Sequence, residues 1–207
     1  RLKDSFRVHC VCCKDVETKE RWAFYDGEKM DVGIEHEHMQ VGEFPEWITN
    51  NALFVAGHNI INFDLLVFFL YFGLEYTIGE TPKVKDTLGG ENVFIHDTLL
   101  LSKLLNPDRL GGHGIEAWGK RLGLEKMDYN GGWEHFNKAM LYYCFRDVDV
   151  NERVLQALRR EWGTWSWSEA YQLEKAVAEI VTRQQHYGFK FDKELAEWCY
   201  EDLSNKM

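Results

Sequence analysis

An apolar run from Leu65 to Phe72 follows a shorter one, Leu53–Ala56, across a polar loop. The shorter run is rich in residues that favour strands, and the longer one is too hydrophobic to lie on the surface. Gly57 permits a sharp turn, and Asn62 is a plausible helix cap. We therefore expect a strand, a tight loop and a buried helix. This unit predicts an α/β fold.

Asp64 falls in the first turn of that expected helix, just past the end of the strand. Open α/β sheets usually bind ligands at this edge, so Asp64 is a candidate site residue. An acidic residue in a first turn also complements the helix dipole, with no further function. This stretch alone leaves both interpretations open.

A second acidic residue favours the functional interpretation. The apolar period predicts a long helix from about Glu134 to Arg160, and Asp147 falls inside its apolar stripe, one turn after Tyr143. A carboxylate facing a core is costly unless it is paired or binds a metal ion. The alternative is a salt bridge, for instance to a lysine on a neighbouring helix.

Asp64 and Asp147 could thus converge at one sheet edge. Hard divalent ions prefer oxygen ligands, and phosphoryl-transfer enzymes often hold two such ions. Two aspartates are too few for two ions. Asp97 is a third candidate, although we prefer to interpret it as a helix cap at the turn of Thr98.

The remaining pattern alternates strands and helices after an initial hairpin, which predicts an α/β domain with a mixed sheet. We interpret residues 26–40 as a solvated loop, although its row from Glu35 to His38 could bind metal. Gly163 and Thr164 break the helical pattern, so we expect one domain over residues 1–163 and a helical connector over residues 164–207. The expected strands are Arg7–Lys14, Arg21–Tyr25 and Val93–His96. The expected helices are Val41–Asn51, Leu99–Leu105, Ile115–Leu122, one from Ser166 or Ser168 to Tyr187 that stops at Gly188, and a separate last helix after Asp192 that runs to Met207.

Charge and cysteine content narrow the function. A net charge of −10 disfavours a passive nucleic-acid binder, but not a nuclease whose bound metals reverse the local charge. Among the five cysteines, Cys10 and Cys13 form a C-x-x-C without a second pair, and strand alternation points them apart. Zinc or redox roles are therefore disfavoured, and free thiols indicate a reducing compartment. No apolar run is long enough to span a membrane.

Asn59-x-x-x-Phe63-Asp64 and the later Tyr143-x-x-x-Asp147 resemble the second and third motifs of the DEDDy exonucleases, which are ribonuclease-H-like proofreading domains. The segments from Asp97 to Ser102 and from His113 to Gly123 narrow the resemblance to phage family A DNA polymerases of the short-tailed phages. The likeness spans nearly the whole chain.

The resemblance implies a ribonuclease-H-like mixed sheet flanked by helices. It implies a 3′→5′ exonuclease that releases nucleoside monophosphates from single-stranded or mispaired DNA 3′ ends, with two Mg²⁺ ions that Mn²⁺ can replace. Its partners would be a DNA 3′ end and a polymerase domain or subunit, with no membrane, for a monomer in the cytoplasm of the host bacterium. The implied roles are metal binding for Asp64 and Asp147, water positioning for Tyr143, and DNA contacts for Asn59, Phe63, Leu2 and His113.

One departure from the family is serious. Its first motif, Asp-x-Glu on a central strand, is missing, and Asp15-Val16-Glu17 has the spacing but lies in the hairpin turn. We expect an apolar strand bearing Asp-x-Glu shortly before Arg1, between the hairpin and Leu53–Ala56. A chain that starts at Arg1 should therefore have little or no exonuclease activity, and those two strands should not pair directly. The alternatives are an inactive DNA-binding or polymerase-docking scaffold and an RNA-directed exonuclease of the same type.

Overall fold

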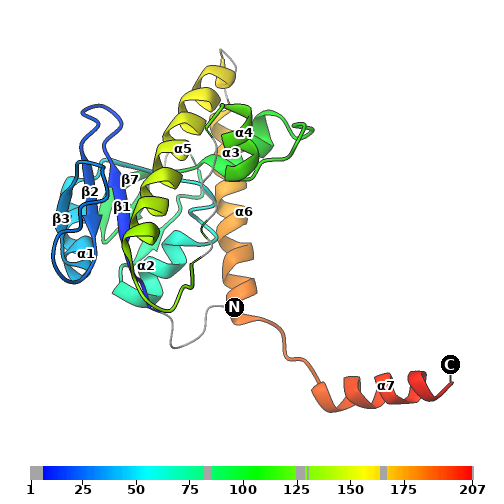
Figure 1. The fold of residues 1–207 in the computed structure, drawn as a ribbon. Helices are drawn as coiled ribbons and strands as arrows, with labels where there is room; N and C mark the ends of the chain where they lie inside the picture. The colour runs from blue at the N-terminus through cyan, green and yellow to red at the C-terminus, as the bar shows by residue number, and fades with distance from the viewer. Residues whose placement is uncertain (1–6, 82–84, 125–128, 130, 164–166, 207) are drawn as a thin grey trace.

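The computed structural model describes residues 7–81, 85–124, 129, 131–163 and 167–206. Figure 1 shows strands and helices interleaved along the chain, which confirms the expected α/β class. The strands are β1 (Val11–Lys14), β2 (Arg21–Phe24), β3 (Glu37–Met39), β4 (Phe54–Gly57), β5 (Tyr76–Thr77), β6 (Asp86–Leu88) and β7 (Glu91–Asp97). The helices are the 3-10 turn η1 (Val41–Glu43), α1 (Phe44–Asn51), α2 (Asp64–Phe72), α3 (Thr98–Leu105), α4 (Ile115–Arg121), α5 (Lys138–Trp162), α6 (Ser168–Tyr187) and α7 (Lys193–Lys206).

The described strands form two mixed sheets, whereas the sequence predicted one. The first has the order β1-β2-β3, with β2 antiparallel to β1 and parallel to β3. The second has the order β4-β7-β6-β5, in which only β4 and β7 run parallel. No ladder joins β1 to β4 among the described residues, as expected. The strand expected before Arg1 lies outside the chain and stays a prediction.

The unit of β4, loop and α2 follows the sequence prediction closely. Asp64 is the first residue of α2, and Gly73, at φ 67°, ends the helix in a left-handed conformation. The predicted cap was wrong, because Phe63 occupies the N-cap position and no side chain caps α2. Asn62 instead accepts a hydrogen bond from Thr182 of α6 and donates one to Asn59. It therefore ties the loop to α6.

Part of the segment that we interpreted as a solvated loop is a strand. Residues Glu37–Met39 form β3 and pair with β2. His36 is buried, with Nδ1 2.8 Å from the carbonyl of Ile34, and Nε2 of His38 lies 3.1 Å from the carbonyl of Tyr25. His36 thus makes a contact within its own loop, and His38 links β3 to the residue that follows β2.

The long helices α5 and α6 pack against other elements, whereas the described residues of the last helix, α7, do not. Helix α5 lies along β1 and α3, and α6 lies against α3. Tyr171 and Ala178 of α6 are buried in two different core clusters. In contrast, α7 has no buried residue among those described and points away from the sheets in Figure 1. The division into residues 1–163 and 164–207 stays a prediction, although α6 packs with the sheets.

Candidate active site at the ends of β4 and β7

Asp97, at the end of β7, organises the loop that follows β4. Its carboxylate accepts hydrogen bonds from the backbone N–H groups of Asn59 and Ile61, at 3.1 and 3.2 Å. It also caps α3 through the N–H groups of Leu99 and Leu100. Burial raises the pKa of Asp97, and the four N–H donors oppose that rise. The structure thus supports its interpretation as a cap, with its oxygens already occupied by backbone donors.

The same loop delivers Asp64 to the start of α2. Burial raises the pKa of Asp64 from 3.8 to about 7, while its own backbone N–H acts to lower it. The nearby Cys144 thiol and Asp97 carboxylate raise it further. Cys144 belongs to α5, the helix that also carries Tyr143 and Asp147.

Asn151 fixes α5 against the carboxyl ends of β4 and β7. Its Nδ2 donates to the carbonyl of Ala56 at 3.1 Å, and its Oδ1 accepts from the hydroxyl of Thr98 at 2.7 Å. Asp147 lies one turn earlier on the same face of the helix and is half-buried, with Oδ1 shielded from solvent. The helix face that carries Asp147 is therefore held at the edge from which Asp64 follows.

Basic side chains of the hairpin bind other acids of α5. Lys14 lies 2.7 Å from both Asp149 and Glu152, and Arg21 lies 2.9 Å from Asp149. These hydrogen-bonded cations outweigh burial and lower the pKa values of Asp149 and Glu152. The hairpin thus neutralises the acids on one side of α5, and Asp147 lies elsewhere on the helix surface.

Tyr143 lies within an aromatic cluster. Its ring centroid is 6.0 Å from those of Tyr129 and Trp133, with Trp133 edge-on. Trp133 is 60% exposed, and the backbone beside it is held by a hydrogen bond between its carbonyl and His9. An exposed indole beside Tyr143 offers a surface on which a base could stack.

The candidate DNA-binding residues differ in their exposure and hydrogen bonding. Phe63 is 53% exposed directly before Asp64, and Asn59, at φ 67°, is held by Asn62. The ring nitrogens of His113 lie 2.9 Å from the hydroxyl of Ser102 and 3.2 Å from the carbonyl of Pro107, so the ring braces its glycine-rich loop. Leu2 lies outside the described residues.

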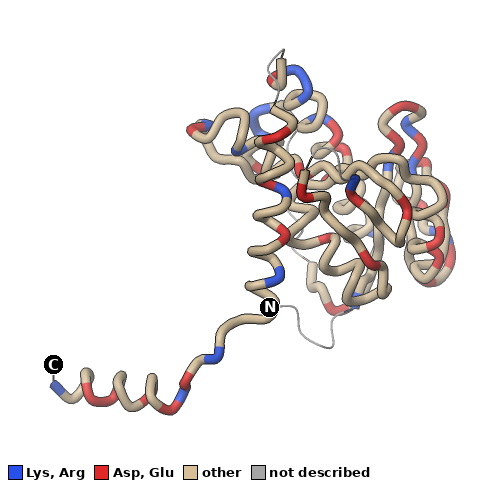
Figure 2. Tube along the Cα trace, turned by 180° about the vertical axis from the view of Figure 1, so that it is seen from behind, with Lys and Arg blue, Asp and Glu red and all other residues tan. Residues whose placement is uncertain are grey.

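Basic residues gather at the end of the molecule that holds α4 and the carboxyl end of α5 (Figure 2). Arg109 and Arg121 stack on the ring of Trp118, at 4.5 and 4.6 Å from its centroid. Arg109 also pairs with Glu161, and Arg121 donates to the carbonyl of Gly112. These two guanidinium groups thus support the fold around the glycine-rich loop.

Sequence reasoning missed Asn151, Thr98 and Tyr171 as supports of the site. The Tyr171 hydroxyl, from α6, accepts from the N–H of Asp97 at 2.7 Å and donates to its carbonyl at 3.2 Å. Asn151 had a sequence signal, because it follows Asp147 by one helical turn.

No family model matches the chain. The DNA-directed DNA polymerase of Escherichia phage T7 is 27% identical over a 158-residue alignment that covers 52% of this chain and 22% of the polymerase. The DNA-directed DNA polymerase of Enterobacteria phage T3 gives the same identity and coverage. The chain is a distant, partial relative of phage DNA polymerases. It spans about a fifth of the length of these relatives.

The relationship places the chain in the context of phage DNA replication. In the part of the chain that the structure describes, none of the helices is both long and apolar enough to cross a membrane.

Proposed function

We propose that this chain is a metal-dependent 3′→5′ exonuclease that trims single-stranded or mispaired DNA ends, as the proofreading part of a family A DNA polymerase. The observation that carries the proposal is the docking of α5 through Asn151, which sets the Asp147 face beside the loop that leads to Asp64. The distant relationship to phage DNA polymerases supports the choice of DNA as substrate.

The donor set suits Mg²⁺ or Mn²⁺, because Asp64 and Asp147 offer hard carboxylate oxygens. Two carboxylates suffice for part of one coordination shell, and a second ion needs further donors, such as the Asp-x-Glu expected before Arg1. The bound ions would generate the nucleophile and stabilise the leaving oxygen. Tyr143 would orient the attacking water through its hydroxyl, and exposed Phe63 would stack on a terminal base.

A polymerase-docking scaffold is the second candidate, and the surface of α6 favours it. Leu173, Val177 and Ile180 are 61, 46 and 56% exposed, so α6 presents apolar side chains to solvent while other residues of the helix pack on α3 and the second sheet. An exposed apolar surface of this kind often marks a protein interface. One chain could both dock on a polymerase and cleave DNA. Cleavage requires Asp147, whereas docking does not.

In the test, a strand of alternating apolar residues that carries Asp-x-Glu is fused to the chain before Arg1. Shortening of a 5′-labelled single-stranded oligonucleotide is then followed with Mn²⁺ present. We expect a ladder of products shortened from the 3′ end, which Asp147→Ala abolishes and Asp149→Asn leaves intact, because Asp149 is bound by Lys14 and Arg21.

The unfused chain should show little or no cleavage. A ladder that persists in Asp147→Ala would refute the exonuclease proposal and leave the scaffold. Efficient cleavage by the unfused chain would refute the need for the additional strand.

A further inference from the structure

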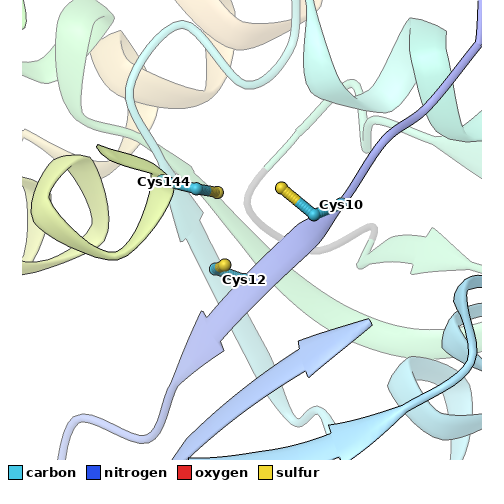
Figure 3. A group of neighbouring side chains, drawn as sticks. All are labelled: Cys10, Cys12 and Cys144. Carbon is cyan, nitrogen blue, oxygen red and sulfur yellow. The ribbon is translucent and has the colours of Figure 1, made fainter. Parts of the chain in front are cut away.

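Three cysteines from two elements meet beside the hairpin. Cys10 directly precedes β1, Cys12 lies within it, and Cys144 reaches them from α5, as Figure 3 shows. Their three sulfur atoms lie within 4.8 Å of one another, and all three thiols are free. Residues two apart on a strand share one face, so this convergence follows from the packing of α5 on β1.

We propose that Cys10, Cys12 and Cys144 form a three-thiolate site for a thiophilic divalent cation such as Zn²⁺. This proposal does not rest on the proposed nuclease activity. Sequence reasoning disfavoured zinc because Cys13 points away from Cys10, and the structure keeps Cys13 out of the group. Cys144, far along the chain, supplies the third ligand instead.

The geometry suits such an ion. Zinc–sulfur bonds of about 2.3 Å in a tetrahedral site place sulfurs roughly 3.8 Å apart, so the thiols need to close by no more than about 1 Å. Soft thiolates select Zn²⁺ and similar ions over Mg²⁺. Within the described ranges, no His, Asp or Glu side chain joins the group, which leaves the fourth position for water. All three cysteines are partly buried as whole residues.

The charge distribution also favours a cation. The neighbouring thiols of Cys12 and Cys144 lower the pKa of Cys10 to about 4. Burial raises the pKa of Cys12, so a bound cation would have to displace its proton. The surrounding side chains of Leu141 and Phe145 are apolar and buried, so they strengthen the attraction between ion and thiolate.

An ion at this site would tie β1 to the turn of α5 that holds Tyr143 and Asp147.

Cadmium binding can be followed by absorbance, because cadmium–thiolate bonds absorb in the ultraviolet. The chain is titrated with Cd²⁺ in a phosphine reductant and excess Mg²⁺, which occupies carboxylate sites. We expect one Cd²⁺ per chain, and at least about tenfold weaker binding after Cys10→Ser, Cys12→Ser or Cys144→Ser.

Two controls separate this site from adventitious binding. Cys199→Ser, at an exposed position of α7, and Cys13→Ala, outside the group, should leave Cd²⁺ binding unchanged. Unchanged binding in Cys144→Ser, or equal weakening in Cys199→Ser, would overturn the proposal.

A second measurement needs no substitution. Zn²⁺ should protect Cys10, Cys12 and Cys144 together from alkylation in the unaltered chain, as mapped by mass spectrometry, while Cys199 stays reactive. Labelling of the three cysteines that Zn²⁺ does not change would also overturn the proposal.

Discussion

At the scale of single residues, Tyr143 is the candidate whose role is easiest to isolate. Removing its hydroxyl takes away a water-orienting group while keeping the ring that packs with Tyr129 and Trp133. In the strand-bearing chain, Tyr143→Phe should lower the cleavage rate roughly a hundredfold, the effect of misplacing a reacting group. Mn²⁺ affinity should stay unchanged. Equal rates for Tyr143→Phe and the parent would assign Tyr143 to packing alone.

Asp64 predicts a pH dependence of stability. Its folded-state pKa, about 7, lies above its ordinary value of 3.8, so between these values the folded chain holds a proton that the unfolded chain has lost. The contribution of Asp64 to the free energy of unfolding must then fall as pH rises from about 4 to 7. Metal-free chemical denaturation across this range should show the fall. It should be smaller in Asp64→Asn, and an identical slope in both proteins would contradict the assignment.

Candidate residues were predictable from sequence to different degrees. Asp64 was placed correctly at the start of α2, and Asp97 as the N-cap of α3, because the local pattern of an apolar strand before a helix decides their position. The cap at Asn62 was wrong because a contact with Thr182 of α6 outweighs the local preference for capping. The group around Cys144 was missed for a related reason, because a contact between distant segments leaves no local signal.

At the scale of elements, the long helices were predictable and the short strands were not. Strands of two or three residues, such as β3, β5 and β6, carry too few side chains to show a period, and pairing with partners elsewhere determines them. The row Glu35–His38 reads as polar in sequence, yet β3 runs through it because β2 supplies the backbone hydrogen bonds.

The attachment of α6 to the second sheet depends on a buried ion pair. Lys175 lies 2.5 Å from Asp86 of β6, and their side chains are only 5 and 3% exposed. Asp86 also accepts from the N–H groups of Gly79 and Ile95, so losing the lysine leaves a buried charge only partly compensated. Lys175→Met should lower the free energy of unfolding by about 3–5 kcal/mol in chemical denaturation.

The matched control for this pair lies on the same helix. Arg183 pairs with Glu179, and the arginine side chain is 63% exposed. Arg183→Met should change the free energy of unfolding by less than about 1 kcal/mol, because solvent screens the pair. Similar losses in the two variants would show that Lys175 matters through its packed side chain and not through its charge.

At the scale of the whole molecule, the candidate site lies where the helices α2 and α5 meet the end of the parallel strands β4 and β7. Loop contacts of Asp97 set the start of α2, and Asn151 sets α5, so the site is assembled from segments far apart in sequence. The sequence predicts the two carboxylates as site residues, while the contacts that hold their helices at this edge came from the structure. The two separate sheets were not foreseen either, because strand pairing leaves no local signature.

If Asp64 and Asp147 bind one ion, a double-mutant cycle on Mn²⁺ binding will show it. Free Mn²⁺ is measured by electron paramagnetic resonance for the strand-bearing chain, Asp64→Asn, Asp147→Asn and the double variant. Asp149→Asn serves as the control. We predict that each single substitution weakens binding at least about tenfold and that the double variant loses much less than the sum, because the ion is shared. Strictly additive losses, or no loss in either single variant, would contradict the claim.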